Sequence, residues 1–594
     1  MSQVLYPNVW GKGALFSYSG LEGECTMYGT MVGQLMQDQL GMRLDKAIEL
    51  YILPRTSRLR HIVVASDLIE GVLYTRVAPG EVEDPIQMLD GIFKENPYAI
   101  LAFNQNTIVG YCPKSVSSPR CRSDFAEELP AEEGKLFQMG NRFYAWVTAE
   151  GETEYTFSIA RGETAEKATA DAKAGLLADI RAIADRRRAY FDKVPVVDGL
   201  TEVQQRTLAK AFSIMKGQVN SPEGVLTCRY TTPDRIPHQK MWLWDSAFHS
   251  IGNIYLDPEL AHETLYAVLL GQREDGMIFH SMGPEGGSID RTQPPILAWA
   301  YWKLYKKTGR VDWVEEAFPI LEGYLDWNFK NRDQNQNLLL EWFTDPQQPT
   351  CRCGESGMDN TPRFDTDAVL EAIDFSCFMA NEMRCMSAMA KLLNKPEAAA
   401  KYADLYQKMG DKINDHLYDT QDNRYYDREL ESGEFSRIPT VSSFLPLFAG
   451  ICPPERAGKL AADLRNPATF ALKHMVPTVA ADHKDFSIDY WRGTTWICYN
   501  YLIEQGCRDN GLTDIADRIV DATVDMVSHW YGRAGCIFEV YDPKGVLCPT
   551  ELHRKGHAPD PTYINSKLQI VQDFGWSSTL YTAMVMERAE RNKK

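Results

Sequence analysis

The chain has 594 residues, more than one ordinary domain holds, so two or three domains are expected. Hydrophobic residues make up 44% of the sequence and charged residues 24%, a composition typical of globular proteins with a sizeable core. The formal net charge of −18 argues against nucleic acid as a partner and favours a protein that handles neutral or small ligands.

The sequence predicts neither a membrane span nor an export signal. No apolar run reaches the roughly 18 residues that a membrane helix needs, and residues 1–20 lack a basic segment followed by an apolar core. The 13 cysteines show neither the spacing nor the histidine companions of a zinc site. We therefore expect a cytoplasmic protein with reduced thiols.

Residues 1–162 have the pattern of an N-terminal antiparallel β-sandwich. Short runs rich in β-branched and aromatic residues recur between turn residues, which is typical of this architecture. No combination of polar residues in this region indicates catalysis. The clearest expected strands are 62–65, 72–77, 98–103, 142–147 and 155–160.

Residues 163–200 are expected to form a helical linker. Residues 164–191 carry apolar side chains such as Leu176, Ile180 and Ile183 at helical intervals, which predicts one long amphipathic helix or two joined ones. The segment 194–199 then has the composition of a linker, and we place the start of the next domain at residue 201.

Residues 201–594 are predicted to be helical throughout. Proline near the first turn marks several helix starts, as at Pro258 and Pro396. Twelve helices fit six hairpins closed into an all-α (α/α)6 toroid, whereas an open α-solenoid should show a repeated signature, and none is found. The expected spans are 201–218, 245–256, 258–272, 293–308, 311–331, 366–393, 396–417, 440–449, 454–464, 491–506, 511–531 and 576–591.

One predicted loop concentrates polar groups. Residues 353–365 hold three carboxylates, among them Glu355 and Asp359, together with Arg363. The glycines and the proline of this segment disfavour helix, and loops on a rigid scaffold commonly carry catalytic groups. A solvated acidic turn is the alternative interpretation.

Aromatic and polar residues also gather at two earlier helix ends. Trp242 and Trp244 would point the same way on an extended approach and form an aromatic wall, while Asp245 caps the following helix. The alternative is a buried tryptophan pair with Asp245 as a plain cap. The turn after the third helix adds Gln272 and His280, although a lone histidine is more often structural.

The last three helix ends complete this pattern. Arg492, between Trp491 and Trp496, can clamp and stack on a small polar ligand. Glu539 follows the eleventh predicted helix, and Trp576 opens the twelfth. If inner and outer helices alternate, these loops meet at one end of the toroid.

In such a pocket Asp359 and Glu539 would face each other among the tryptophans. Glycoside hydrolysis needs this kind of pair, because one carboxylic acid protonates the departing oxygen while a second carboxylate acts across the sugar ring. Only a closed fold brings together two residues so far apart in the sequence.

Residues 355–363 (ESGMDNTPR), 242–245 (WLWD), 490–493 (YWRG) and 574–578 (FGWSS) together resemble glycoside hydrolase family 63. The similarity covers about residues 200–594, where the motifs follow one another in the same order as in the family. It implies a catalytic (α/α)6 barrel like those of trehalases and glucoamylases, and an inverting α-glycosidase with Asp359 as general acid and Glu539 as general base. It also implies that the subsite for the non-reducing sugar is lined by Trp244, Asp245, Arg363, Trp491 and Arg492.

The resemblance leaves several points open. Asp542 and Glu551 are alternatives to Glu539 as the base. The chain lacks the large insertions of the eukaryotic members that process oligosaccharides, so we expect an α-glucosidase acting on small α-linked glucosides, or a hydrolase of mannosyl- or glucosylglycerate-like molecules. The segments 283–291 and 547–564 are the expected specificity elements.

Other classes of protein on a similar toroid remain alternatives. They are a trehalase, a glycoside phosphorylase, a non-catalytic glycan-binding module and a histidine-dependent epimerase. For an inverting hydrolase, the two carboxyl groups should lie about 6.5–9.5 Å apart to admit water. No motif indicates a cofactor or a metal, while a calcium site built from scattered oxygens is left open.

Overall fold

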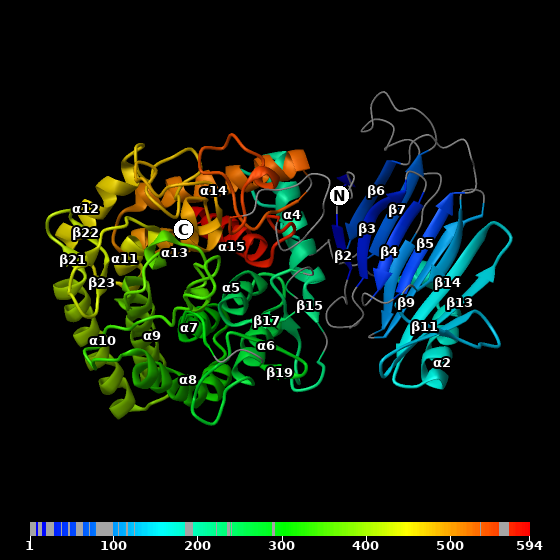
Figure 1. The fold of residues 1–594 in the computed structure, drawn as a ribbon, viewed down its shortest axis with the longest axis horizontal. Helices are drawn as coiled ribbons and strands as arrows, with labels where there is room; N and C mark the ends of the chain where they lie inside the picture. Colours follow the sequence, from blue (N-terminus) through cyan, green and yellow to red (C-terminus); the bar gives the residue numbers. More distant parts are fainter. Residues whose placement is uncertain are drawn as a thin grey trace.

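The computed structural model contains a β-rich N-terminal region followed by a ring of helices (Figure 1). The described residues are the strands between residues 7 and 104, and residues 106–593 with internal gaps. These gaps are 115–116, 124, 184–193, 221, 235–237, 239, 288–290, 535 and 557–568.

The N-terminal strands form two antiparallel sheets. The nine-stranded sheet has the order β1-β6-β7-β8-β9-β14-β13-β12-β11, and the five-stranded sheet has the order β10-β5-β4-β3-β2. The predicted strands correspond to β6, β7, β8, β13 and β14, while Ile62 and Tyr98 lie outside the described residues. The packing of the two sheets into a sandwich stays a prediction. The strands are β1 (Pro7–Val9), β2 (Leu15–Tyr18), β3 (Gly29–Met36), β4 (Gln39–Leu44), β5 (Ile48–Pro54), β6 (Val63–Ile69), β7 (Val72–Ala78), β8 (Ala99–Asn104), β9 (Thr107–Pro113), β10 (Ser117–Arg122), β11 (Glu127–Leu129), β12 (Lys135–Met139), β13 (Arg142–Glu150) and β14 (Glu154–Gly162).

Helix α2 (Ala165–Leu176) packs on β13 and β14. Thr164 caps its first turn, and the small side chains of Ala168 and Ala172 are fully buried, which lets the helix approach the sheet closely. The helix is interrupted after Leu176 and residues 180–183 are helical again, so of the two predicted alternatives the described residues fit two successive helices. Residues 184–191 of that prediction lie outside the described residues.

Each of the twelve predicted helices has a counterpart in the helical domain. Their apolar periodicity and the prolines near their first turns explain this agreement. They are α4 (Glu202–Gly217), α5 (Leu243–Asn253), α6 (Pro258–Leu269), α7 (Leu297–Thr308), α8 (Val311–Arg332), α9 (Ile373–Leu392), α10 (Pro396–His416), α11 (Leu445–Ala449), α12 (Pro454–Arg465), α13 (Ile497–Asp509), α14 (Thr513–Ala534) and α15 (Gly575–Asn592).

The inner helices form a closed ring. Helix α5 contacts α7, and the contacts continue through α9, α11 and α13 to α15, which packs back against α5. Where the ring closes, the Lys210 ammonium lies 3.0 Å from the Asp573 carboxylate, and the Tyr581 hydroxyl donates to the Gln204 carbonyl at 3.0 Å. The helical part of the chain is therefore a toroid, as predicted.

Burial separates the inner helices from the outer ones. Every residue of α5 is buried, whereas α10 buries one face and exposes a charged one. This difference follows from sequence, because α9 is apolar on nearly all sides and α10 is amphipathic. None of the described helices has both the length and the apolar character needed to cross a membrane.

Several predicted helix starts were wrong, among them those of α7, at Leu297 rather than 293, and α11, at Leu445 rather than 440. Three others can be described from their neighbouring contacts. Helix α9 begins at Ile373 rather than at residue 366, because the strand Leu370–Glu371 pairs with Asp427–Glu429. Helix α13 begins at Ile497, since Thr495 pairs with Tyr541 just before it. Helix α5 begins at Leu243, so Asp245 lies in its first turn and does not cap it.

Candidate active site

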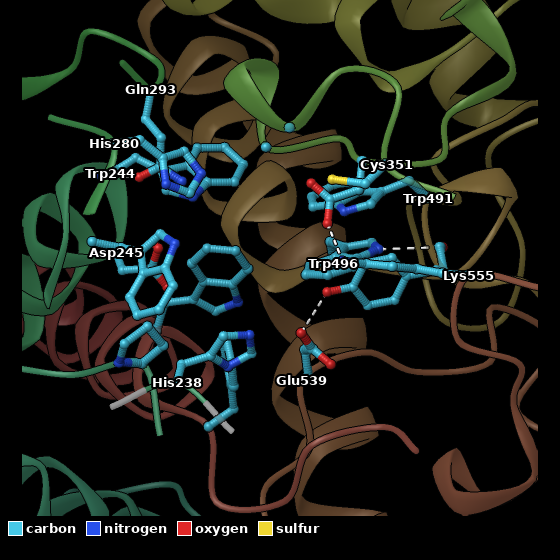
Figure 2. Close-up of a pocket in the computed structure, with 18 of the residues that line it drawn as sticks. His238, Trp244, Asp245, His280, Gln293, Cys351, Trp491, Trp496, Glu539 and Lys555 are labelled. Carbon is cyan, nitrogen blue, oxygen red and sulfur yellow. Dashed lines mark hydrogen bonds and ion pairs between the residues drawn. The ribbon is translucent and has the colours of Figure 1, made fainter. Parts of the chain in front are cut away.

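Loops at one end of the toroid enclose a pocket of about 190 Å³ (Figure 2). Figure 2 shows Glu539 and Lys555 on one wall and Asp245 and His238 on the other. Most of the predicted site residues contribute to this lining. Those that do are Trp242, Trp244, Asp245, His280, Asp359, Trp491, Trp496, Glu539 and Trp576.

The tryptophans form one continuous aromatic cluster. Trp491 and Trp496 stack with ring centroids 3.6 Å apart, and the ring of Trp244 meets the edge of Trp576 at 5.1 Å. All four are at least 97% buried, so they are core residues as well as pocket walls. Of the predicted pair, Trp244 is buried and Trp242 is half-buried, and both line the pocket.

Glu539 is held at the base of the pocket by three neighbours. The Tyr490 hydroxyl donates to Glu539 Oε1 at 2.7 Å, Arg554 Nε donates to Oε2 at 3.2 Å, and the Val571 amide donates to Oε2 at 3.4 Å. Burial raises the pKa of Glu539, but the charge and hydrogen bonds of Arg554, together with Tyr490, outweigh it and hold the pKa below its ordinary value. Glu539 is therefore an ionised carboxylate at neutral pH.

Asp359 lies in the loop predicted to be central, and its side chain is 17% exposed. Its carboxylate forms an ion pair with the Lys555 ammonium. The preceding Gly357 has φ of 74°, and a side chain there would place Cβ 2.7 Å from Cη2 of Trp244. Glycine is required at this position on both counts.

Asp245 and His280 differ in their charge states. Burial, followed by the negative charge of Asp234, raises the pKa of Asp245 well above its ordinary value, which favours the protonated acid. Burial, together with the charge of Arg291, lowers the pKa of His280 to about 3, which leaves a neutral imidazole. Both side chains can therefore offer hydrogen bonds to a neutral ligand without adding charge.

Comparison with known proteins gives a family match. Residues 237–546 match the mannosylglycerate hydrolase MGH1-like glycoside hydrolase domain. The chain belongs to this family. It is a glycoside hydrolase, and the resemblance to glycoside hydrolase family 63 is confirmed.

Curated relatives of this glycoside hydrolase include two mannosylglycerate hydrolases and a mannosyl-oligosaccharide glucosidase. The mannosylglycerate hydrolase of Thermus thermophilus is 25% identical over 395 residues, which cover 53% of this chain and 91% of the relative. That of Rubrobacter radiotolerans is 24% identical, covering 61% of this chain and 94% of the relative. The mannosyl-oligosaccharide glucosidase of Saccharomyces cerevisiae is also 24% identical, covering 42% and 31%.

Solved structures share the fold. The GH63 mannosylglycerate hydrolase from Thermus thermophilus in complex with glucose has a TM-score of 0.52 at 22% identity, covering 64% of this chain and 99% of that one. A bacterial glucoamylase complexed with acarbose has a TM-score of 0.56 at 11% identity, covering 99% and 96%.

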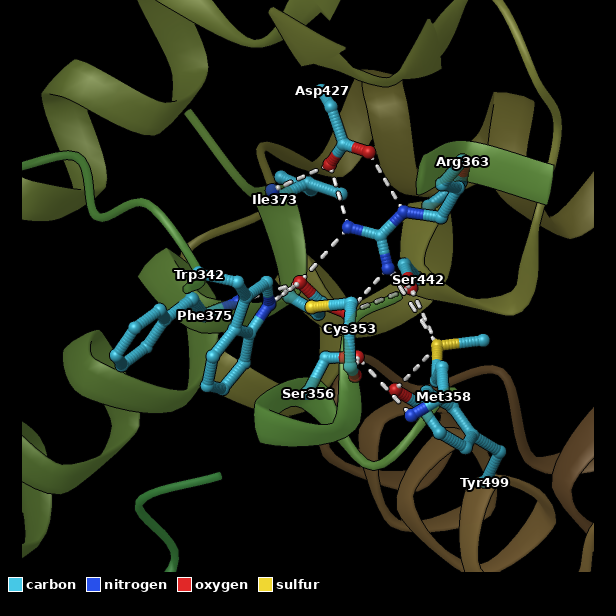
Figure 3. Close-up of polar contacts among 12 residues, drawn as sticks. Trp342, Cys353, Ser356, Met358, Arg363, Ile373, Phe375, Asp427, Ser442 and Tyr499 are labelled. Atoms are coloured by element: carbon cyan, nitrogen blue, oxygen red, sulfur yellow. Dashed lines mark hydrogen bonds and ion pairs between the residues drawn. The ribbon is translucent and has the colours of Figure 1, made fainter. Parts of the chain in front are cut away.

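Arg363 of the glycoside hydrolase does not line the pocket, contrary to its predicted contact with the sugar. Its guanidinium is 2% exposed and is enclosed by Asp374, Asp427 and Ser442 (Figure 3). Nε and Nη2 each donate to Asp427 at 2.7 Å, and Nη2 also donates to Asp374 at 2.9 Å. All of its donors are thus engaged within the protein.

The same network fixes the residue before Asp359. The sulfur of Met358 accepts hydrogen bonds from Tyr499 at 3.2 Å and from Arg363 and Ser442 at 3.6 Å each (Figure 3). Arg363 therefore anchors the loop that presents Asp359 and leaves ligand contact to other side chains.

Glu355, Gln272 and Arg492 also lie outside the lining, again because protein groups engage them. Glu355 is fully buried and accepts two hydrogen bonds from Arg332, at 2.8 and 2.9 Å. Gln272 donates to the Ile320 carbonyl at 2.7 Å. Arg492 pairs with Asp365 at 2.7 Å.

The two alternatives for the base lie outside the pocket. Asp542 accepts amide hydrogen bonds from Lys544, Val546 and Leu547 and so closes a turn. Glu551 is exposed and accepts the Cys548 amide at 2.8 Å.

Sequence reasoning missed several pocket residues. Tyr490, inside the recognised YWRG motif, and Lys555 line the pocket and were not predicted. Arg554, also not predicted, lies outside the lining and contacts Glu539, while Lys555 contacts Asp359. The basic run 553–555, inside an expected specificity segment, was the available signal. The remaining lining residues that were not named individually are Pro233, His238, Arg291, Gln293, Cys351, Gly354, Gly357 and Phe574. Of these, Gly354 and Gly357 lie in the predicted loop 353–365, Phe574 in the FGWSS motif and Arg291 in the expected specificity segment 283–291.

Proposed function

We propose that this glycoside hydrolase cleaves small α-linked glucosides with inversion, using Asp359 as general acid and Glu539 as general base. The observation that supports this most is that one pocket holds both carboxylates, with Glu539 kept ionised by Arg554. A base must be ionised to accept a proton from water, and its surroundings favour that state.

The proposed reaction has one chemical step. Asp359 gives its proton to the glycosidic oxygen as the bond from that oxygen to the anomeric carbon breaks. Glu539 takes a proton from a water molecule, whose oxygen forms the new bond on the opposite face of the sugar. The stacked tryptophans exclude other water and strengthen these electrostatic interactions.

A glycerate glycoside, such as the mannosylglycerate of the relatives' names, is the second candidate substrate. Two cations favour it. Arg291 lines the pocket, forms no ion pair among the described residues, and has a buried Nε without a hydrogen-bond partner. Lys555 lies beside Asp359. A carboxylate on the leaving group would pair with these cations and draw Lys555 away from Asp359, which must carry a proton when the bond breaks.

The test is a panel of α-glucosides, α-mannosides, trehalose, glucosylglycerate and mannosylglycerate, each with and without added phosphate. We expect phosphate-independent hydrolysis, and proton NMR of the first-formed sugar should show the inverted β anomer. A preference for glycerates over the matching methyl glycosides would select the second candidate. Retention of the anomeric configuration, phosphorolysis or no cleavage would contradict the proposal.

Removing either carboxylate should abolish turnover without unfolding the protein. We expect Asp359→Asn and Glu539→Gln each to lower kcat by about 100- to 10,000-fold, because each removes one proton transfer. Glu551→Gln is the matched control, since Glu551 was an alternative base and lies outside the pocket. Near-normal activity of either pocket variant in a steady-state assay would refute its assigned role.

The domain division is part of the same proposal. We infer a β-sandwich at residues 1–162, a linker at 163–200 and a catalytic barrel at 201–594. The likeness of bacterial glucoamylase over 99% of the chain supports this arrangement.

A further inference from the structure

We propose that Asn360 is a positioning residue that fixes the position of the general acid relative to the general base. It does so through hydrogen bonds that run from Asn360 across residues 489–491 to Tyr490 and from there to Glu539. We call this chain of contacts the cross-loop bridge. The proposal rests on the roles assigned above to Asp359 and Glu539.

The first half of the bridge ties the Asp359 loop to a second loop. Asn360 follows Asp359 directly, and its side chain is 7% exposed. Its Oδ1 accepts the Trp491 amide at 3.0 Å, and its Nδ2 donates to the Asp489 carbonyl at 3.4 Å. The side-chain amide thus spans the peptide units on either side of Tyr490, and any displacement of one loop is passed to the other.

The second half leads from Tyr490 to the base. Tyr490 has φ of 52°, a left-handed backbone conformation that is unfavourable for a non-glycine residue and persists only where its surroundings hold it. The two Asn360 contacts flank this residue and hold it. In that conformation the Tyr490 hydroxyl donates to Glu539 Oε1 at 2.7 Å.

The barrel alone does not fix this geometry. Asp359 and Glu539 come from separate loops, and an inverting enzyme needs a set gap between its carboxyl groups. A misplacement of about 1 Å can cost roughly 100-fold in rate. The bridge connects the loop of Asp359 through Tyr490 to Glu539, so it sets the positions of both carboxylates together.

A double-mutant cycle tests this coupling. Asn360→Ala, Tyr490→Phe and the double variant are assayed on a 2,4-dinitrophenyl glycoside of the sugar that the wild type cleaves. Its leaving group departs without a proton from Asp359. The kcat on this substrate therefore reports the activation of water by Glu539. We expect each single variant to lose about 10-fold in kcat, and the double variant at most about twofold more than the larger single loss, because both changes break one bridge.

Two further readouts separate positioning from simple structural support. Tyr490→Phe should move the acidic limb of the pH–rate profile upward, because the lost hydrogen bond had lowered the pKa of Glu539. Asn360→Ala should lose a further 10-fold or so on the phenyl glycoside, whose leaving group needs the proton of Asp359.

Asn510→Ala is the matched control. Asn510 donates to the carbonyls of Leu447 and Gly506 at 3.0 and 2.8 Å, outside the pocket lining. We expect a comparable loss of thermal stability with unchanged kcat. If Asn360→Ala does not fold, Asn360→Ser takes its place in the same cycle.

If the loss in kcat of the double variant equals the product of the two single losses, the bridge proposal is wrong. It is also wrong if Asn360→Ala slows only the phenyl glycoside and leaves kcat on the 2,4-dinitrophenyl glycoside unchanged. Either result leaves the hydrolase proposal intact. Activity retained by Asp359→Asn or Glu539→Gln would instead overturn the hydrolase roles themselves, so the two failures are distinguishable.

Discussion

The protonation of Glu539 depends mainly on one guanidinium. Glu539 is 1% exposed, and burial alone would raise its pKa. Arg554, itself 3% exposed, supplies the opposing charge. An enzyme whose base is held this way keeps its activity into acid until the pH falls through the lowered pKa.

Arg554→Gln should therefore move the acidic limb of the kcat/KM profile to higher pH. Without the guanidinium, burial raises the pKa of Glu539, and the carboxylate is protonated at pH values where the wild type is active. The measurement is kcat/KM against pH. Arg508→Gln, which breaks an ion pair with Glu504 outside the pocket, is the control. An unmoved limb would contradict the assignment of Glu539 as the base.

Sequence reasoning found the pocket tryptophans and carboxylates because they occur in aromatic and acidic motifs at helix ends. It placed Arg363 and Glu355 wrongly in the lining, because a polar side chain in such a motif can face either a ligand or the protein, and sequence does not distinguish the two. Arg554 and Lys555 were missed because their segment, 547–564, was predicted only as a specificity element, and its basic residues were not assigned to the site. Their partners become visible only when the ring is closed.

At the scale of elements, one buried carboxylate joins two inner helices. Glu382 of α9 accepts the amides of Ala298 and Trp299, at 2.7 and 2.9 Å, in the first turn of α7. These amides have no partner within their own helix. Burial raises the pKa of Glu382 to about 8, above its ordinary value of 4.5.

This shift makes stability depend on pH. Between pH 4.5 and about 8 the folded protein keeps a proton on Glu382 that the unfolded chain loses. The contribution is complete below 4.5 and is lost as the pH rises through 8. Glutamine is always neutral, so the free energy of unfolding of the wild type relative to Glu382→Gln should fall with rising pH, by up to about 1.4 kcal/mol per unit.

Denaturant unfolding at several pH values measures this difference. Glu397→Gln, at an exposed position in the first turn of α10, is the control and should show no such slope. A stability difference for Glu382→Gln that stays constant across the range would contradict the expectation.

The helices themselves were predictable because periodicity and proline are local signals, and the ring followed from their number. The starts of α9 and α13 were not predictable from sequence. The residues just before each helix form β-pairs with segments that are distant in the sequence, so each helix begins later than its local pattern indicates. Tertiary pairing overrode local propensity at both places.

At the scale of the whole molecule, the ring closes where α5 meets α15. Gly252 of α5 lies so close to α15 that an added Cβ would stand 2.5 Å from Cα of Thr579 and 2.6 Å from its carbonyl oxygen. The same two helices carry Trp244 and Trp576, whose rings meet in the pocket wall. Close packing at the seam therefore supports the site directly.

Gly252→Ala should destabilise the protein and reduce its activity. Overpacking costs about 1–3 kcal/mol, which exceeds the gain of roughly 1 kcal/mol in helix propensity. Gly458→Ala in α12 is the control, because its Cβ would meet nothing within 4 Å, and it should be neutral or stabilising. Unfolding curves and kcat of both variants check this, and equal stability would argue against a tight seam.

Closure of the ring by α15 also has a consequence for synthesis on the ribosome. Trp576 and Phe574 complete the pocket, and both belong to the last segment of the barrel to be translated. A nascent chain that has emerged only as far as α14 already carries Asp359 but lacks the wall that α15 provides. Catalytic competence should therefore arise only once α15 has been translated, and chains truncated before residue 575 should be inactive.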